Sequence, residues 1–173
     1  DSDWIVPDGW QPSRKHLQNC KVMLGVDPGY RRSAWLFIIE VAPMDWIVFD
    51  QIMPDNTNDI DAVALINQRG YPIDYIWVDP AADAVQSASG TETRQIMTKI
   101  KTRDPSQKSI RLISQRYRDI AFGVDKLRIL LGGYEGYPIR VRFTQKILDY
   151  ERGNKRGILK SLSCYQYPEL RDG

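Results

Sequence analysis

Two aspartates occupy equivalent places in this 173-residue chain, each directly after a short apolar run and directly before a proline. Asp27 follows residues 21–26 (KVMLGV), and Asp79 follows residues 74–78 (DYIWV). Both runs are typical of buried strands that end in a tight turn. If the two strands are parallel neighbours, about 4.8 Å apart, their carboxylates meet at the carboxyl edge of a sheet, where α/β proteins bind ligands.

Two carboxylates that close together repel one another unless a cation lies between them. Oxygen ligands without a neighbouring His or Cys select Mg²⁺ or Mn²⁺ over zinc. Two such ions, about 3.5–4 Å apart, could activate a water and stabilise the leaving oxygen in phosphodiester cleavage. Asp83 is a candidate third ligand. Each aspartate by itself is also explained as a turn former before proline, and Asp83 as a solvated loop acid.

Other kinds of chemistry have little support in the composition. His16 is the only histidine, and Cys20 and Cys164 stand far apart without a CxxC pair. A structural zinc site and imidazole-based hydrolysis are therefore disfavoured, and His16 is interpreted as a solvated residue before the first strand. No apolar run is long enough for a membrane span and no signal peptide is recognisable, so no membrane partner is expected. The two separated cysteines are typical of a protein in the reducing cytoplasm.

Charge divides the chain into an acidic and a basic part. Residues 1–93 hold 6 Lys and Arg against 14 Asp and Glu, whereas residues 94–160 hold 17 against 6. Such a division suits a metal-carboxylate centre beside a phosphate-binding face, although two ordinary solvated surfaces would also produce it. The predicted DNA contacts include the pair after the Asp27 turn, two arginines of a late strand and a basic turn near residue 155: Arg31, Arg32, Arg140, Arg142, Arg152, Lys155 and Arg156.

The hydrophobic periodicity predicts one mixed α/β domain over residues 21–173, after an N-terminal linker over residues 1–20. An antiparallel meander of three strands, over residues 21–26, 33–41 and 45–52, is followed by parallel strands and flanking helices. Asp45, Asp50 and Asp74 are expected at strand edges. The expected strands are residues 21–26, 33–41, 45–52, 74–78, 110–114, 137–143 and 158–167, and the expected helices are residues 56–70, 92–101, 116–131 and 144–152.

Four stretches carry a family resemblance: LGVDPG, IWVDPAADA, RDIAFGVDKLRILLGG and IRVRFTQKILDYERG. Together they resemble the nuclease domain of tailed-phage terminase large subunits, which belongs to the RuvC-like branch of the RNase H-like nucleases. The resemblance implies an RNase H-like fold and a two-metal Mg²⁺ or Mn²⁺ endonuclease that cuts double-stranded concatemeric viral DNA during genome packaging. It also implies Asp27 and Asp79 as metal ligands, the portal and the small terminase subunit as partners, and the host cell cytoplasm as the location.

The chain departs from that family at two points. It has no GxxxxGK[ST] loop of the terminase ATPase, and the family's third acidic motif has no counterpart before Gly173. We therefore expect an excised domain whose third acidic motif is truncated and whose nuclease activity is weakened. A RuvC-like Holliday-junction resolvase, whose second acid is usually Glu, and a non-catalytic nucleic-acid-binding module of the same fold remain alternatives. An actin-like ATP-binding half would need a second lobe that 173 residues do not supply.

Overall fold

The computed structural model describes residues 4–7, 9–27, 33–54, 57, 59–78, 95, 97–104, 110–112, 127, 129–132 and 138–163. Within them, six strands form one sheet in the order β5-β4-β1-β2-β3-β6. The strands are β1 (Lys21–Asp27), β2 (Ala34–Ala42), β3 (Asp45–Ile52), β4 (Tyr75–Val78), β5 (Ile110–Leu112) and β6 (Val141–Phe143). The helices are α1 (Arg14–Asn19), α2 (Asp59–Arg69), α5 (Gln145–Gly153) and α6 (Ile158–Ser163). None of the described helices is long and apolar enough to cross a membrane.

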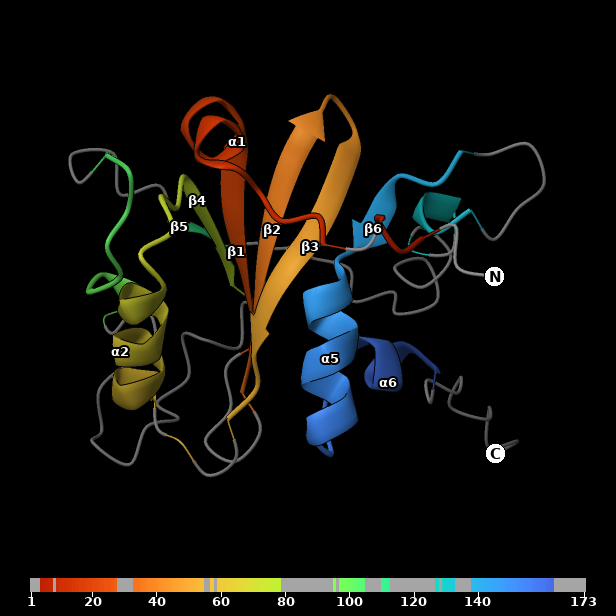
Figure 1. Ribbon diagram of the computed structural model, residues 1–173. Coiled ribbons are helices and arrows are strands. Elements are labelled where there is room, and N and C mark those ends of the chain that lie inside the picture. The colour runs from red at the N-terminus through yellow and green to blue at the C-terminus, as the bar shows by residue number, and fades with distance from the viewer. Residues whose placement is uncertain are drawn as a thin grey trace, which may run out of the picture.

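The middle of the sheet is the predicted antiparallel meander. β1 pairs antiparallel with β2, and β2 pairs antiparallel with β3. The outer pairs β1–β4, β4–β5 and β3–β6 are parallel. Because β1, β3 and β4 all run in one direction, their carboxyl ends lie at the same edge of the sheet (Figure 1). The predicted fold class, a meander followed by parallel strands with flanking helices, is confirmed.

Alternating side chains of β2 pack into two different hydrophobic cores, one on each face of the sheet. Trp35, Phe37 and Ile39 belong to the larger cluster, which includes apolar side chains of β1, β4 and α2. Leu36 and Ile38 lie against a smaller cluster built around residues of β6, α5 and α6. This period of two is what strand geometry requires of a sheet that is covered on both faces. Figure 1 shows α2 on one side of the central strands and α5 beside β3.

The register of β1 and β4 is fixed at their amino ends by Asp74. The Asp74 amide donates to Val22 O, and its carboxylate accepts from the Val22 amide, each at 2.8 Å. Arg103 pairs with the same carboxylate at 2.7 Å and donates to the carbonyl of Cys20. These contacts hold the start of β4 level with the second residue of β1 and so determine which residues are level at the carboxyl ends.

The N-terminal residues add structure that the sequence did not predict. Ile5 bridges to Phe143 of β6, and Trp4 packs edge-on against the Phe143 ring. Helix α1 begins after Ser13, whose hydroxyl accepts from the His16 amide while the His16 ring accepts from the Ser13 amide. His16 thus helps to cap a helix, so placing it in a linker was wrong, although its side chain is half-exposed.

One predicted strand was wrong. Residues 158–167 were expected to form a strand, but the structure has helix α6 at Ile158–Ser163, and residues 164–167 lie outside the described part. The helix forms because buried side chains accept its first amide groups, which are described below. Of the predicted helix over residues 92–101, residues 95 and 97 are helical, whereas residues 98–101 are turn, bend or irregular. The predicted helix over residues 116–131 falls mostly outside the described residues.

Candidate functional site

Asp27 is the last residue of β1 and is exposed at the carboxyl edge of the sheet. Its register partner is Ala34, the first residue of β2. Since Val26 is buried in the larger core, the alternation of the strand places Asp27 on the opposite face of the sheet, the one covered by α5 and α6. This carboxylate therefore lies at the edge where the sequence analysis expected it.

The parallel pairing of β1 and β4 is confirmed, and it is in register to the strand ends. Leu24 pairs with Ile76, and Val26 pairs with Val78. Asp79, which directly follows Val78 in the sequence, lies outside the described residues, as does Asp83. The distance between the two predicted carboxylates is therefore not described, and their joint role stays a prediction. The residues that the structure does describe contain no group of three His, Cys, Asp or Glu that could hold a metal ion.

Two buried polar atoms flank the register partner of Asp27. The Ser33 hydroxyl and the Trp35 indole nitrogen are buried and make no hydrogen bond in the described part of the chain. Buried polar groups usually have a partner, so such atoms call for an explanation by solvent or a ligand. Trp35 belongs to the larger core, and Ser33, two residues before it, is on the same face of the sheet, which is opposite to the face of the Asp27 side chain.

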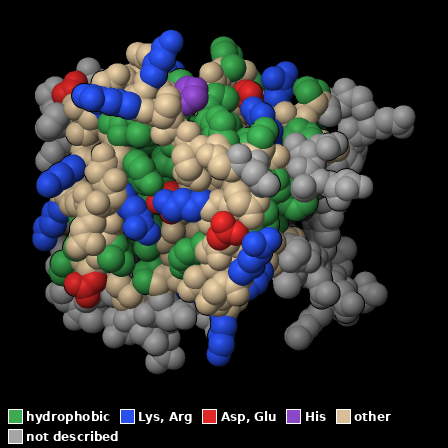
Figure 2. Space-filling model, viewed as in Figure 1, with side chains coloured by type: hydrophobic (Ala, Val, Ile, Leu, Met, Phe, Trp, Pro, Cys, Tyr) green, Lys and Arg blue, Asp and Glu red, His purple; other side chains and the backbone are tan. Residues whose placement is uncertain are grey.

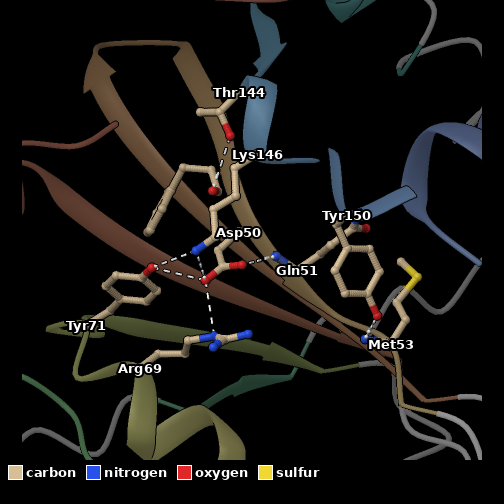
Figure 3. Close-up of polar contacts among 9 residues, drawn as sticks. Asp50, Gln51, Met53, Arg69, Tyr71, Thr144, Lys146 and Tyr150 are labelled. Carbon is tan, nitrogen blue, oxygen red and sulfur yellow. Dashed lines mark hydrogen bonds and ion pairs between the residues drawn. The ribbon is translucent and has the colours of Figure 1, made fainter. Parts of the chain in front are cut away.

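A second carboxylate, Asp50 of β3, has the opposite environment, with only 3% of its side chain exposed. Its Oδ2 accepts from Lys146 Nζ at 2.7 Å and from the Tyr71 hydroxyl at 3.0 Å, and lies 3.2 Å from Arg69 Nε. Its Oδ1 accepts from the Gln51 amide at 2.9 Å. Figure 3 shows the side chains converging on Asp50 from α5, from the end of α2 and from the segment after it. We call Asp50, Arg69, Tyr71 and Lys146 the Asp50 cluster.

A β-bulge gives Asp50 this environment. Ile38 pairs with Val48 and Phe37 pairs with Asp50, which leaves Phe49 as the extra residue. A bulge redirects side chains, and here the Tyr71 ring packs against both Phe37 and Phe49 while its hydroxyl reaches Asp50. Burial raises the pKa of Tyr71 above its usual 10.0, and the nearby Asp50 charge raises it further. Tyr71 is therefore a proton donor to Asp50 at neutral pH.

The expectation that Asp50 is a strand-edge acid was wrong, because the bulge, α2 and α5 enclose it. Asp45 and Asp74 are half-buried and each pairs with an arginine. The only hint of the Asp50 cluster in the sequence was a charged residue inside an apolar strand, DWIVFDQI. A charge in such a strand needs partners, but the partners come from residues 69, 71 and 146, and the sequence does not show that these are near.

A third carboxylate, Glu151 of α5, is buried and caps α6. Its oxygens accept from the amides of Leu159 at 2.8 Å and Lys160 at 2.9 Å. Gln51 of β3 completes the cap by accepting from the Ile158 amide at 3.0 Å. A Cβ on Gly157 would overlap the Glu151 carboxyl group, so the turn before α6 requires glycine for close approach. Glu151 is thus committed to holding α6 against β3.

The residues predicted to contact DNA differ in their exposure and in whether a carboxylate already pairs with them. Arg31 and Arg32 lie outside the described residues, Arg140 and Lys155 are exposed, and Arg156 is half-buried. Arg152 has 75% of its side chain exposed and pairs with Asp149 at 3.1 Å, a weak surface contact. Arg142, by contrast, donates through one nitrogen to both oxygens of Asp45 at 2.8 Å. Arg142 is therefore already engaged by a carboxylate, while the role of all seven residues in DNA binding stays a prediction.

Comparison with known proteins finds similarity at the level of structure. No family model and no curated protein matches the chain. The nuclease domain of the P22 large terminase matches with a TM-score of 0.53 and 8% identity, covering 86% of this chain and 71% of that one. The yeast mitochondrial Holliday junction resolvase Ydc2 matches with a TM-score of 0.52 and 12% identity, covering 87% and 79%. The nuclease domain of the bacteriophage SPP1 large terminase, solved with bound Mn, matches with a TM-score of 0.50 and 8% identity, covering 88% and 78%.

Identities this low show a shared fold. The fold is the RNase H-like mixed α/β arrangement that the motifs predicted, and the predicted resemblance to terminase nuclease domains is confirmed in structure. The resolvase has the same likeness, so the shared fold does not separate these two kinds of protein.

Proposed function

We propose that this chain is a metal-dependent DNA endonuclease that uses Asp27 and Asp79 as metal ligands. The observation that carries the proposal is the parallel register of Val26 with Val78, because an aspartate follows each of these residues in the chain. Adjacent parallel strands are about 4.8 Å apart, so carboxylates at matched strand ends are close enough to share a cation. The likeness to solved nuclease domains supports the same reaction class.

The residues at this edge fit a hard divalent cation. Asp27 is an exposed carboxylate at this edge, and the only histidine of the sequence lies in α1 at the other end of the sheet (Figure 1). Oxygen donors without imidazole or thiolate favour Mg²⁺ or Mn²⁺. Such ions, when bound, supply Lewis-acid activation of a phosphodiester. The task of Asp27 and Asp79, with Asp83 as a candidate third donor, is to fix their position at the edge.

Positively charged side chains would hold the substrate at this edge by contacts to its backbone. Figure 2 shows Lys and Arg side chains distributed over the face viewed in Figure 1. Arg152 and Lys155 are exposed cations at the end of α5 that can contact phosphates, and Arg31 and Arg32 follow the Asp27 turn in sequence. Arg140 is also exposed, but it precedes β6 and lies level with the start of β3, at the opposite edge of the sheet. Contacts to phosphates position DNA without selecting its sequence, so we expect binding that falls steeply with salt and depends little on base sequence.

The specific role proposed is cleavage of double-stranded concatemeric viral DNA during genome packaging in the host cytoplasm. It rests on the motif resemblance and on the fold shared with two phage terminase nuclease domains. In that role the portal and the small terminase subunit would be partners of the complete packaging protein. The second candidate is a Holliday-junction resolvase, which the equally good structural match to the yeast enzyme favours.

Cleavage assays test the proposal and separate the two candidates. The chain is incubated with plasmid DNA, linear duplex and a four-way junction in Mn²⁺, in Mg²⁺ and in EDTA. We expect cleavage of plasmid and linear duplex that EDTA abolishes, and loss of that cleavage in Asp27→Asn and Asp79→Asn. Asp104→Asn is the matched control, because Asp104 is an exposed aspartate that follows Arg103 near the amino end of β4.

Full cleavage by either Asp27→Asn or Asp79→Asn would refute the metal-ligand assignment. Cutting restricted to the four-way junction would favour the resolvase. Absence of cleavage in every metal, by protein that still binds duplex, would favour a non-catalytic module of the same fold.

A further inference from the structure

The Asp50 cluster carries more positive than negative charge. One buried carboxylate faces two cations, Arg69 and Lys146, and the Tyr71 hydroxyl between them is neutral. A single ion pair would have satisfied a buried aspartate, so the second cation is not needed to compensate its charge. In the part of the chain that the structure describes, no other acidic side chain pairs with Arg69 or Lys146. The cluster therefore has capacity for a further anion.

Asp50 also fixes where the two cationic groups lie. Lys146 Nζ is 2.7 Å and Arg69 Nε 3.2 Å from the same oxygen, so the two nitrogens are separated by no more than the sum of those distances. A phosphate group presents several acceptor oxygens around one phosphorus and can accept from two donors at such a separation. Because the buried carboxylate already orders both side chains, binding an anion would cost little side-chain entropy.

Both cations remain open to solvent. Arg69 and Lys146 each have 42% of the side chain exposed, whereas Asp50 beneath them has 3%. Arg69 uses Nε toward Asp50, which leaves the two terminal nitrogens of its guanidinium for an outer partner. Figure 2 shows basic side chains at the middle of this face, between α2 and α5, with acidic atoms beneath them.

The cluster is separate from the carboxyl edge but within reach of the same DNA. Asp50 is level with Phe37 and thus with Leu24, three residues before Asp27 and two strands away from it. These offsets put the two aspartate Cα atoms about 14 Å apart, from a rise of about 3.3 Å per residue and a strand spacing of about 4.8 Å. A DNA duplex carries one negative charge per about 1.7 Å of its axis. A duplex bound at the carboxyl edge therefore has other phosphates about 14 Å from the bound one.

We infer that Arg69 and Lys146, held in place by Asp50 and Tyr71, bind a backbone phosphate of duplex DNA away from the cleavage site. The inference deepens the proposed function, because it takes the same DNA as its ligand. The excess of Lys and Arg in residues 94–160, which include Lys146, favours a polyanion over an acidic protein partner. The contact holds the duplex against the molecular surface between α2 and α5 that Figure 2 shows, and it has no base specificity.

Salt-dependent binding tests the inference independently of cleavage. Fluorescence anisotropy of a labelled duplex is measured in EDTA over a range of salt concentrations, for wild type, Arg69→Gln and Lys146→Gln. Each variant should bind about tenfold more weakly, the effect of one lost charge-assisted hydrogen bond. The slope of log affinity against log salt should fall by about one unit in each variant.

The matched control is Arg14→Gln, which removes an exposed arginine from α1 at the opposite end of the sheet. Its affinity and slope should equal those of the wild type. Each single variant keeps one cation beside Asp50, and thermal unfolding verifies that it is folded. If both cluster variants are folded and behave like Arg14→Gln, the cluster serves stability alone and the inference is refuted.

A nuclear magnetic resonance measurement on the wild-type protein provides a second test of the inference. The Arg69 Nε–H resonance should shift when the duplex is added and should return toward its free position at high salt, and an unmoved resonance would contradict the inference. Binding is measured without metal and cleavage is assayed separately with Mn²⁺ or Mg²⁺. A chain that binds DNA through this cluster but cuts it with neither metal would refute the proposed nuclease and leave the inference standing. A chain that cuts DNA with an unchanged slope in both cluster variants would do the reverse.

Discussion

Asp27 and Asp50 are the same residue type on parallel strands of one sheet, yet their surroundings differ completely. Asp27 lies at the strand end and is exposed, whereas Asp50 lies inside a bulged strand, accepts from three donors and forms an ion pair with Arg69. An exposed strand-end carboxylate keeps its oxygens accessible to an incoming cation. A buried one must be neutralised by the protein itself, because an uncompensated charge in the interior is very costly. The position of an aspartate within its strand therefore decides whether its carboxylate can bind a ligand or instead forms part of the folded interior.

The largest effect on stability should come from removing both cations of the Asp50 cluster. The double variant Arg69→Met/Lys146→Met leaves Asp50 buried with only the Tyr71 hydroxyl and one amide as donors. We expect it to lower the free energy of unfolding by about 3–5 kcal/mol at neutral pH, measured by urea denaturation. Asp27→Asn should change it by less than about 0.5 kcal/mol, because Asp27 is exposed. Equal losses in the two proteins would contradict the contrast between the two aspartates.

A smaller loss of stability is expected from a change beside the third carboxylate, Glu151. This buried side chain accepts hydrogen bonds from the first amides of α6. Gly157→Ala puts a methyl group where the Glu151 carboxyl lies, so the cap of α6 must shift. We expect a loss of about 1–3 kcal/mol, the usual cost of overpacking. Gly153→Ala is the matched control, since a Cβ there meets nothing within 4 Å. A loss in Gly153→Ala as large as in Gly157→Ala would show that close packing on Glu151 is not the cause.

The smallest effect concerns Tyr71 and appears only at high pH. Burial and Asp50 raise the pKa of Tyr71 in the folded protein, so above about pH 10 the unfolded chain loses this proton first. The unfolded state then binds fewer protons than the folded state, and stability falls as pH rises. Wild-type protein should therefore lose more stability than Tyr71→Phe between neutral pH and pH 11, as thermal unfolding can measure. Parallel pH profiles for the two proteins would show that Tyr71 is not perturbed.

Prediction from the sequence was best where the signal was local. The runs ending at Val26 and Val78, the meander between them and the helix at residues 145–153 follow from apolar periodicity and turn residues. Helix α6 was missed because its amide groups are capped by Gln51 and Glu151, which lie 107 and 8 residues away in the relevant hydrogen bonds. A short segment without its own cap residue has no helical signal of its own.

The sequence by itself determined the strand that ends in Asp27, the matched apolar run before Asp79 and the mixed α/β fold class, while the structure decided that the two strands are parallel neighbours in register. Apolar alternation and Asp-Pro turns depend only on residues that are neighbours in the sequence, so they can be recognised without the tertiary structure. Only the tertiary structure decided that Asp50 is buried under Arg69 and Lys146 and that Glu151 caps a helix. Those environments depend on a bulge and on side chains that folding brings together from distant parts of the chain, and charge compensation acts through space rather than along the sequence.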